Sequence, residues 1–326
     1  KDLLDRDYLD LYSNPSIMRS MIETEEKAIL ALIDRIPSVR VPNYAYRNNR
    51  DLTFTNCAGE WGLGIPSHSN GAAYGDLDND GDLDLVVNNV NMPSFIFRNE
   101  SAGTDSTSYL VVKLKGLKQN TSAIGASLTL YAEDKLHYHE QVPMRGFKSS
   151  MDHRVHFGLG RLSAVDSLHV SWPDGTDTLI RNIPVPQLIE IEQGKSGLSF
   201  EEGNGEFAAN RTISPDNPAP TMLFRQVPPP PGLDYLHREN EYNDFDRHRL
   251  LFQMHSNEGP CMAVADVNGD GLDDLFLGGA KDSPAALFLQ KPGGSFARMN
   301  NPLFEEDRIS EDTDAAFLDA DGDGDP

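Results

Sequence analysis

The stretch that decides the fold is Gly-Ala-Ala-Tyr-Gly-Asp-Leu-Asp-Asn-Asp-Gly-Asp-Leu-Asp-Leu-Val-Val, at residues 71–87. A short apolar run precedes a loop rich in aspartate, and a second short apolar run follows it. Apolar runs of this length beside glycine-rich turns predict β-strands. The acidic loop is therefore expected to join two buried strands.

Two further segments repeat this pattern. Residues 261–277 and 314–326 align with residues 71–87 without gaps, and the third copy runs to the end of the sequence. The second and third loops begin at Asp266 and Asp319, about 50 residues apart. Hairpins are predicted before the first and third loops, at residues 44–54 and 286–296. Because four short strands in about 50 residues make one propeller blade, the repeat predicts β-propeller blades.

Each acidic loop has the spacing of an aspartate-rich calcium loop. Oxygen ligands at positions 1, 3 and 5 point inward when the chain curls around a cation, and glycine at position 6 permits the sharp turn. Position 7 would supply its backbone carbonyl, and position 9 would close the site. Hard oxygen donors favour Ca²⁺ over zinc, which prefers His and Cys, and over magnesium, which keeps several waters. The predicted ligands are Asp76, Asp78, Asp80, Asp82, Asp84, Asp266, Asn268, Asp270, Leu272, Asp274, Asp319, Asp321, Asp323 and Asp325.

Two other interpretations of the loops are weaker. An EF-hand needs a bidentate Glu at position 12, where the first two loops have Val87 and Leu277, and the flanking segments are not helical. An acidic turn without metal is the plainer alternative, but three copies at fixed positions in strand repeats count against it. Because clustered carboxylates repel one another without a cation, the predicted calcium is structural. The third loop lacks its ninth position.

The other segments predict one helix, one β domain and one linker. Residues 15–36 have helical apolar spacing, with Asn14 as the cap and Pro37 as the stop. This helix either packs on the propeller or docks a partner. Residues 109–192 predict a small β-sandwich inserted between blade-forming segments. The proline-rich residues 210–235 predict a linker or an extended strap.

The amino-acid composition argues against some classes of binding partner and against a membrane-spanning segment. The formal net charge of −23 repels phosphate backbones, which argues against nucleic acid. No run of 18 apolar residues occurs, so the sequence predicts no transmembrane segment. The two cysteines, Cys57 and Cys261, occupy different places in the repeat, which favours two small buried hydrophobes over a disulfide.

The loops and their flanking strands resemble the FG-GAP or VCBS repeat of integrin-α-type propellers, over residues 40–99 and 236–326. Between them lie Ile124-Gly125-Ala126, the run from His156 to Gly160 and the run from Val165 to Gly175, which resemble the ASPIC/UnbV domain. That domain accompanies such repeats in cartilage acidic protein and in many bacterial surface proteins, and residues 48–99 are similar to large VCBS-repeat proteins of Bacteroidota. The resemblance implies an extracellular propeller with bound calcium and no established chemistry.

Together these patterns predict a mainly β fold. It combines an incomplete set of FG-GAP-type blades, an inserted small β-sandwich and one helical insertion, as expected for a piece of a longer chain. The expected divisions are residues 1–46, helical insertion and linker; 47–107, a blade with its calcium loop; 108–193, the ASPIC/UnbV-like domain; 194–250, the proline-rich connection; and 251–326, blades with two calcium loops.

No catalytic motif is present in the sequence. There is no Gly-x-Ser-x-Gly elbow, Walker loop or His-Glu-x-x-His run. His137, His139, His153 and His156 could form a zinc site only if folding brought a third ligand, so ordinary strand histidines are favoured. The preferred hypothesis is a non-enzymatic, calcium-stabilised cell-surface scaffold that binds protein or glycan, with an accessory role in an outer-membrane complex as one version. The alternative is part of a carbohydrate-active or other hydrolytic enzyme whose active site lies in blades absent from this sequence.

Overall fold

The computed structural model describes residues 39–101, 108–195, 223–240, 244, 256 and 258–321. The described chain is mainly β, as predicted, with α4 (Pro302–Asp307) as its one α-helix. The helix predicted at residues 15–36 lies outside the described residues, as do residues 210–222 of the proline-rich segment.

The first acidic loop lies in a four-stranded antiparallel sheet of the blade type. Its strands in spatial order are β17 (Phe224–Val227), β7 (Phe95–Asn99), β6 (Asp84–Asn89) and β5 (Ser69–Gly75). The loop joins β5 to β6, with Gly75 opposite Asp84. The fourth strand, β17, follows the whole sandwich in sequence and comes from the segment expected to be a connection. The sandwich is therefore inserted between the third and fourth strands of this blade.

The second acidic loop joins β18 (Met262–Ala265) to β19 (Asp274–Leu277), and the blade continues through β20 (Ala286–Lys291) and β21 (Ser295–Arg298). Two strands from the inserted domain extend this sheet: β12 (Ser149–Ser150) pairs in parallel with β18, and β11 (Met144–Gly146) lies outside β12. We call residues 141–154 the sandwich arm, because this segment reaches from the inserted domain onto the inner strand of the second blade.

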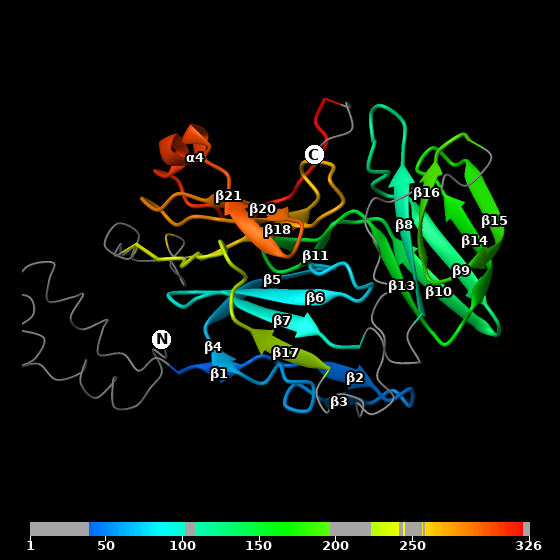
Figure 1. The fold of residues 1–326 in the computed structure, drawn as a ribbon, viewed down its shortest axis with the longest axis horizontal. Coiled ribbons are helices and arrows are strands. Elements are labelled where there is room, and N and C mark those ends of the chain that lie inside the picture. The colour runs from blue at the N-terminus through cyan, green and yellow to red at the C-terminus, as the bar shows by residue number, and fades with distance from the viewer. Residues whose placement is uncertain are drawn as a thin grey trace, which may run out of the picture.

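The inserted domain is the predicted β-sandwich. One sheet has the order β10 (Lys135–Glu140), β9 (Ser127–Ala132), β14 (Ala164–Ser171), β15 (Asp177–Pro184), and the other has the order β13 (Val155–Gly160), β8 (Ser108–Lys115), β16 (Gln187–Glu192). Alternating side chains from both sheets fill one core, in which Leu128, Leu130, Leu168, Ile183 and Ile189 are fully buried. In Figure 1 the sandwich stands beside the two blades, and the arm crosses between them.

The remaining strands are short. The hairpin predicted at residues 44–54 is confirmed as β2 (Tyr46–Asn48) and β3 (Phe54–Asn56), and the one predicted at residues 286–296 is confirmed as β20 and β21. A further pair joins β1 (Val41–Pro42) to β4 (Pro66–Ser67). Both cysteines are free and buried, as the sequence favoured.

The third copy of the repeat differs from the other two. Its apolar run at residues 315–318 forms no strand among the described residues. In the first two copies, the strand before the loop is held by the strand after it.

Candidate metal centre

The first acidic loop folds around the carboxylate of its first aspartate. The backbone amides of Asp80 and Gly81 donate to Oδ1 and Oδ2 of Asp76, both at 3.0 Å, and the amide of Asp82 donates to Asp80 Oδ1 at 3.2 Å. Gly81 adopts φ 92°, the left-handed region that glycine occupies without steric cost. These bonds curl the loop so that carboxylate oxygens of Asp76, Asp78 and Asp80 lie within 4.8 Å of one another.

The second loop repeats this geometry residue by residue. The amides of Asp270 and Gly271 donate to Asp266 Oδ1 and Oδ2 at 3.0 and 2.9 Å, and the amide of Leu272 donates to Asp270 Oδ1 at 3.0 Å. The side-chain oxygen of Asn268 also accepts from the Asp270 amide. Two separate stretches of sequence therefore build the same curled loop, which supports the predicted equivalence of their ligand positions.

Aspartate at position 9 fastens the loop to the blade. Asp84 Oδ2 accepts from the amide of Leu77, and its Oδ1 accepts from the amide of Asn99 at the end of the third strand. Asp274 makes the same two bonds, to the amides of Val267 and Gln290. Both oxygens of each carboxylate accept hydrogen bonds from backbone amides. The aspartate at position 9 therefore fixes the shape of the loop, in addition to any contact with a cation.

The loop carboxylates lie in an unfavourable environment for negative charge. Burial, together with the neighbouring carboxylates of Asp273 and Asp80, raises the pKa of Asp76 to about 8. Burial raises the pKa of Asp84 to about 8 and that of Asp274 to about 6. Desolvated carboxylates that crowd one another are stabilised in their charged form by a cation. The donor set in the first loop, three clustered carboxylates and no His or Cys, fits a hard divalent ion such as Ca²⁺.

The other predicted ligand positions differ in their exposure to solvent. Asp82 is buried, and its Oδ2 accepts from the Ser101 hydroxyl at 3.1 Å, whereas Asn268 and Asp270 are exposed. In the third loop, Asp319 Oδ2 accepts from the hydroxyl of Thr121 in the sandwich at 2.6 Å, and Asp321 is exposed. Asp323 and Asp325 lie outside the described residues.

Sequence reasoning missed a buried charge cluster that connects the two loops. Asp273, fully buried at position 8 of the second loop, accepts from the backbone amide of Asp76 at 3.0 Å and from the guanidinium of Arg154 in the sandwich arm. Arg154 also pairs with Asp152. The first ligand of one loop is thus positioned by a side chain of the other. The only signal in the sequence was an acid at position 8, where the first loop has Leu83.

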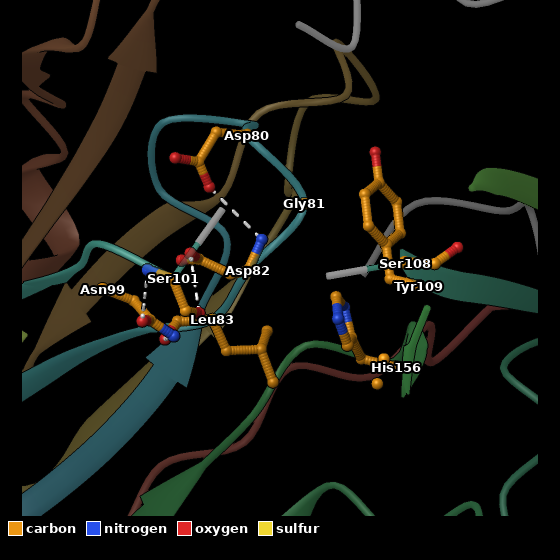
Figure 2. Close-up of a pocket in the computed structure, with 11 residues that line it drawn as sticks. Asp80, Gly81, Asp82, Leu83, Asn99, Ser101, Ser108, Tyr109 and His156 are labelled. Atoms are coloured by element: carbon orange, nitrogen blue, oxygen red, sulfur yellow. Dashed lines mark hydrogen bonds between the residues drawn. The ribbon is translucent and has the colours of Figure 1, made fainter. Parts of the chain in front are cut away.

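A cavity of about 280 Å³ lies beside the first loop. Figure 2 shows Asp80, Asp82, Asn99 and Ser101 on one wall, and Tyr109 and His156 of the sandwich on the other. The rings of Tyr109 and His156 stack with centroids 5.7 Å apart. A Cβ on Gly81 would lie 2.0 Å from the Tyr109 ring, so this glycine permits close packing of the sandwich on the loop as well as the turn.

The four histidines do not form a metal cluster among the described residues. His137 and His139 both face the ring of Phe157 from β10, at 6.5 and 6.2 Å between centroids. His156 lies against Tyr109, and His153 Nε2 lies 3.0 Å from the carbonyl of Phe317. They pack as ordinary half-buried strand and loop side chains.

The fold and the loops together define a protein built from propeller-like blades with aspartate-rich loops and an inserted β-sandwich. Comparison with protein families agrees: the FG-GAP-like repeat model matches residues 32–87 and 266–326, and the ASPIC and UnbV model matches residues 116–198. The chain therefore carries FG-GAP-like repeats around an ASPIC/UnbV domain, as the sequence suggested. A search of curated proteins found no match. Within the described part of the chain, no helix has the length and apolar character needed to cross a membrane.

Proposed function

We propose that this protein is a non-enzymatic, calcium-stabilised extracellular scaffold that recognises protein or glycan through the surfaces around its blades. One observation carries the proposal: two separate loops adopt the same hydrogen-bonding scheme, and in the first it gathers the oxygens of Asp76, Asp78 and Asp80 within 4.8 Å. Domains of FG-GAP-like repeats are typically extracellular and act in binding, which supports both the setting and the role.

In this scaffold the role of calcium is to stabilise the folded structure. The cation supplies positive charge to buried carboxylates, and the chain supplies the frame: Asp84 and Asp274 fasten each loop to the third strand of its blade. Asp273 and Arg154 then connect both loops to the sandwich arm. Calcium in the loops would therefore stabilise the junction of blades and sandwich along with the loops themselves.

Metal content and binding can be measured directly. We expect the purified protein to hold calcium after gel filtration in chelator-free buffer, and isothermal titration of the stripped protein to show binding that Asp78→Asn weakens. A matched substitution at Asp134, an acidic turn residue of the sandwich outside the loops, should leave the isotherm unchanged. Equal binding by wild type and Asp78→Asn would contradict the assignment of the first loop.

The binding role has a separate test. The protein is screened against a glycan library for both retention and product release. We expect retention without new products. Release of defined oligosaccharides by the pure protein would instead support the hydrolytic alternative.

A further inference from the structure

A second cavity, of about 190 Å³, lies where the sandwich arm meets the inner strand of the first blade. Its lining comes from Tyr74 and Asp76 on the blade side, from Arg145, Asp152 and Arg154 on the arm, and from His139 and His156 of the sandwich. Leu83, Val111, Val142 and Met151 supply apolar surface. All of these residues belong to described segments of the chain.

The charged groups around this cavity are paired, with one exception. Asp152 pairs with Arg154, and Arg154 also pairs with Asp273. Asp76 turns both carboxylate oxygens to backbone amides of its own loop. Arg145 has no ion pair among the described residues, although the chain carries a net charge of −23.

Arg145 is nevertheless held in place. Its Nη2 lies 3.0 Å from His139 Nε2 and donates to the backbone carbonyl of Glu140. Within the described chain no hydrogen bond uses Nε or Nη1, so this edge of the guanidinium still has N–H donors to offer. A guanidinium fixed at one side and open at the other is suited to bind a planar or tetrahedral oxyanion through two parallel hydrogen bonds.

The neighbouring side chains of the lining are polar and uncharged. Burial, and then proximity to Arg145, lower the pKa of His139 to about 4, and burial and Arg154 lower that of His156 to about 4. Both imidazoles are therefore neutral at physiological pH and each keeps one N–H. The side chain of Tyr74 lines the same cavity. Neutral polar side chains, one guanidinium with unused N–H donors, and apolar walls match a small ligand with an acidic group on an uncharged body.

We infer that this junction cavity binds a small oxyanion-bearing ligand, a carboxylate or sulfate carried on a compact organic body such as an acidic sugar residue, with Arg145 as its ionic anchor. The inference deepens the proposed scaffold function by naming a ligand class for one surface. It does not depend on calcium in the first loop, although a cation there would offset the nearby charge of Asp76 and favour an anion.

The test uses the whole protein in calcium buffer and four probes: glucuronate, glucose 6-sulfate, glucose and inorganic sulfate. Binding is followed by ligand-observed NMR and by thermal shift. We expect saturable binding of either acidic sugar, none of glucose, and weaker binding of sulfate alone. Arg145→Gln should weaken binding about tenfold or more, whereas Arg181→Gln, on an exposed position of β15, should change it less than about twofold.

Each possible result of this experiment either supports or overturns the inference. Because Arg145 is exposed, its replacement is expected to leave the melting temperature near that of wild type, so that lost binding is not lost folding. Binding of glucose as tight as glucuronate, equal affinity in Arg145→Gln and wild type, or no binding of any of the three anions at millimolar concentration would each overturn the inference. If inorganic sulfate bound with the same affinity as glucose 6-sulfate, the claim that the cavity recognises the organic part of the ligand would be wrong. The claim that Arg145 binds the oxyanion would stand.

Discussion

At the scale of single residues, Gly81 and Gly271 have the same backbone and different surroundings. Both have positive φ, 92° and 84°. A Cβ on Gly81 would collide with the Tyr109 ring, whereas a Cβ on Gly271 would meet nothing within 4 Å. The two loops therefore separate the conformational role of this glycine from its packing role, which only the first loop has.

This difference predicts unequal effects of the same substitution. Gly271→Ala should lower the free energy of unfolding by about 1 kcal/mol, the usual cost of a left-handed alanine. Gly81→Ala should add a further cost of about 1–3 kcal/mol from overpacking against Tyr109. Chemical denaturation in calcium measures both, and adding Tyr109→Ala should remove the extra cost. Equal destabilisation by the two alanines would show that the sandwich does not pack on the loop in this way.

At the scale of elements, the sandwich arm is joined to both loops by a buried charge cluster. Arg154 lies between Asp152 and Asp273, and Asp273 holds the amide of Asp76. Removal of one member of a buried pair leaves an uncompensated charge, which costs more than removal of both. The first loop has Leu83 at the position of Asp273, so an apolar residue is compatible with this loop geometry.

We therefore predict non-additive effects in this cluster. Arg154→Met should lower the free energy of unfolding by about 3–5 kcal/mol, because it leaves the buried carboxylate of Asp273 without its ion-pair partner. The double variant Arg154→Met, Asp273→Leu should recover more than half of that loss. Urea denaturation of the two single variants and the double variant gives the coupling energy, and additive losses would contradict the pairing.

The contact of β8 and β13 with the first loop should also be sensitive to acid. Burial and Arg154 lower the pKa of His156 to about 4, below its ordinary value of 6.5. Between these two values the unfolded chain binds more protons than the folded one, so stability falls as the pH drops from 6.5 to 4. In saturating calcium, His156→Phe should remove on the order of 2 kcal/mol of this dependence. An unchanged pH profile in His156→Phe would refute the assignment.

Local sequence patterns predicted the individual strands. They did not predict which strands distant in sequence would pair in one sheet. The strands on both sides of the first two loops were predictable, because apolar runs and glycine turns alternate there. The placement of β17 beside β7 was not, since the whole sandwich separates them in sequence. The same holds for the site: ligand positions came from spacing, whereas Asp273, Arg154 and Tyr109 meet the first loop only through tertiary packing.

At the scale of the whole molecule, the buried carboxylates connect calcium to pH. Without a cation, Asp76 and Asp84 have pKa values of about 8 in the folded state, above the ordinary value of 3.8. The folded state then binds more protons than the unfolded one, so stability falls as the pH rises toward 8. In chelator, the melting temperature should therefore drop between pH 6.5 and 8, a window above the titration of His156. Saturating calcium should abolish the drop, and a flat profile in chelator would contradict the charge assignment.

The most direct test of the account is the melting temperature at pH 7.5 in chelator, in calcium, and after calcium is added back to the stripped protein. Binding to the folded state alone stabilises it by mass action, so we predict a loss of several degrees in chelator and its full recovery with calcium. The triple variant Asp76→Asn, Asp78→Asn, Asp80→Asn should lose part of the response that wild type shows. Identical melting in chelator and in calcium would contradict the claim that these loops hold a structural cation.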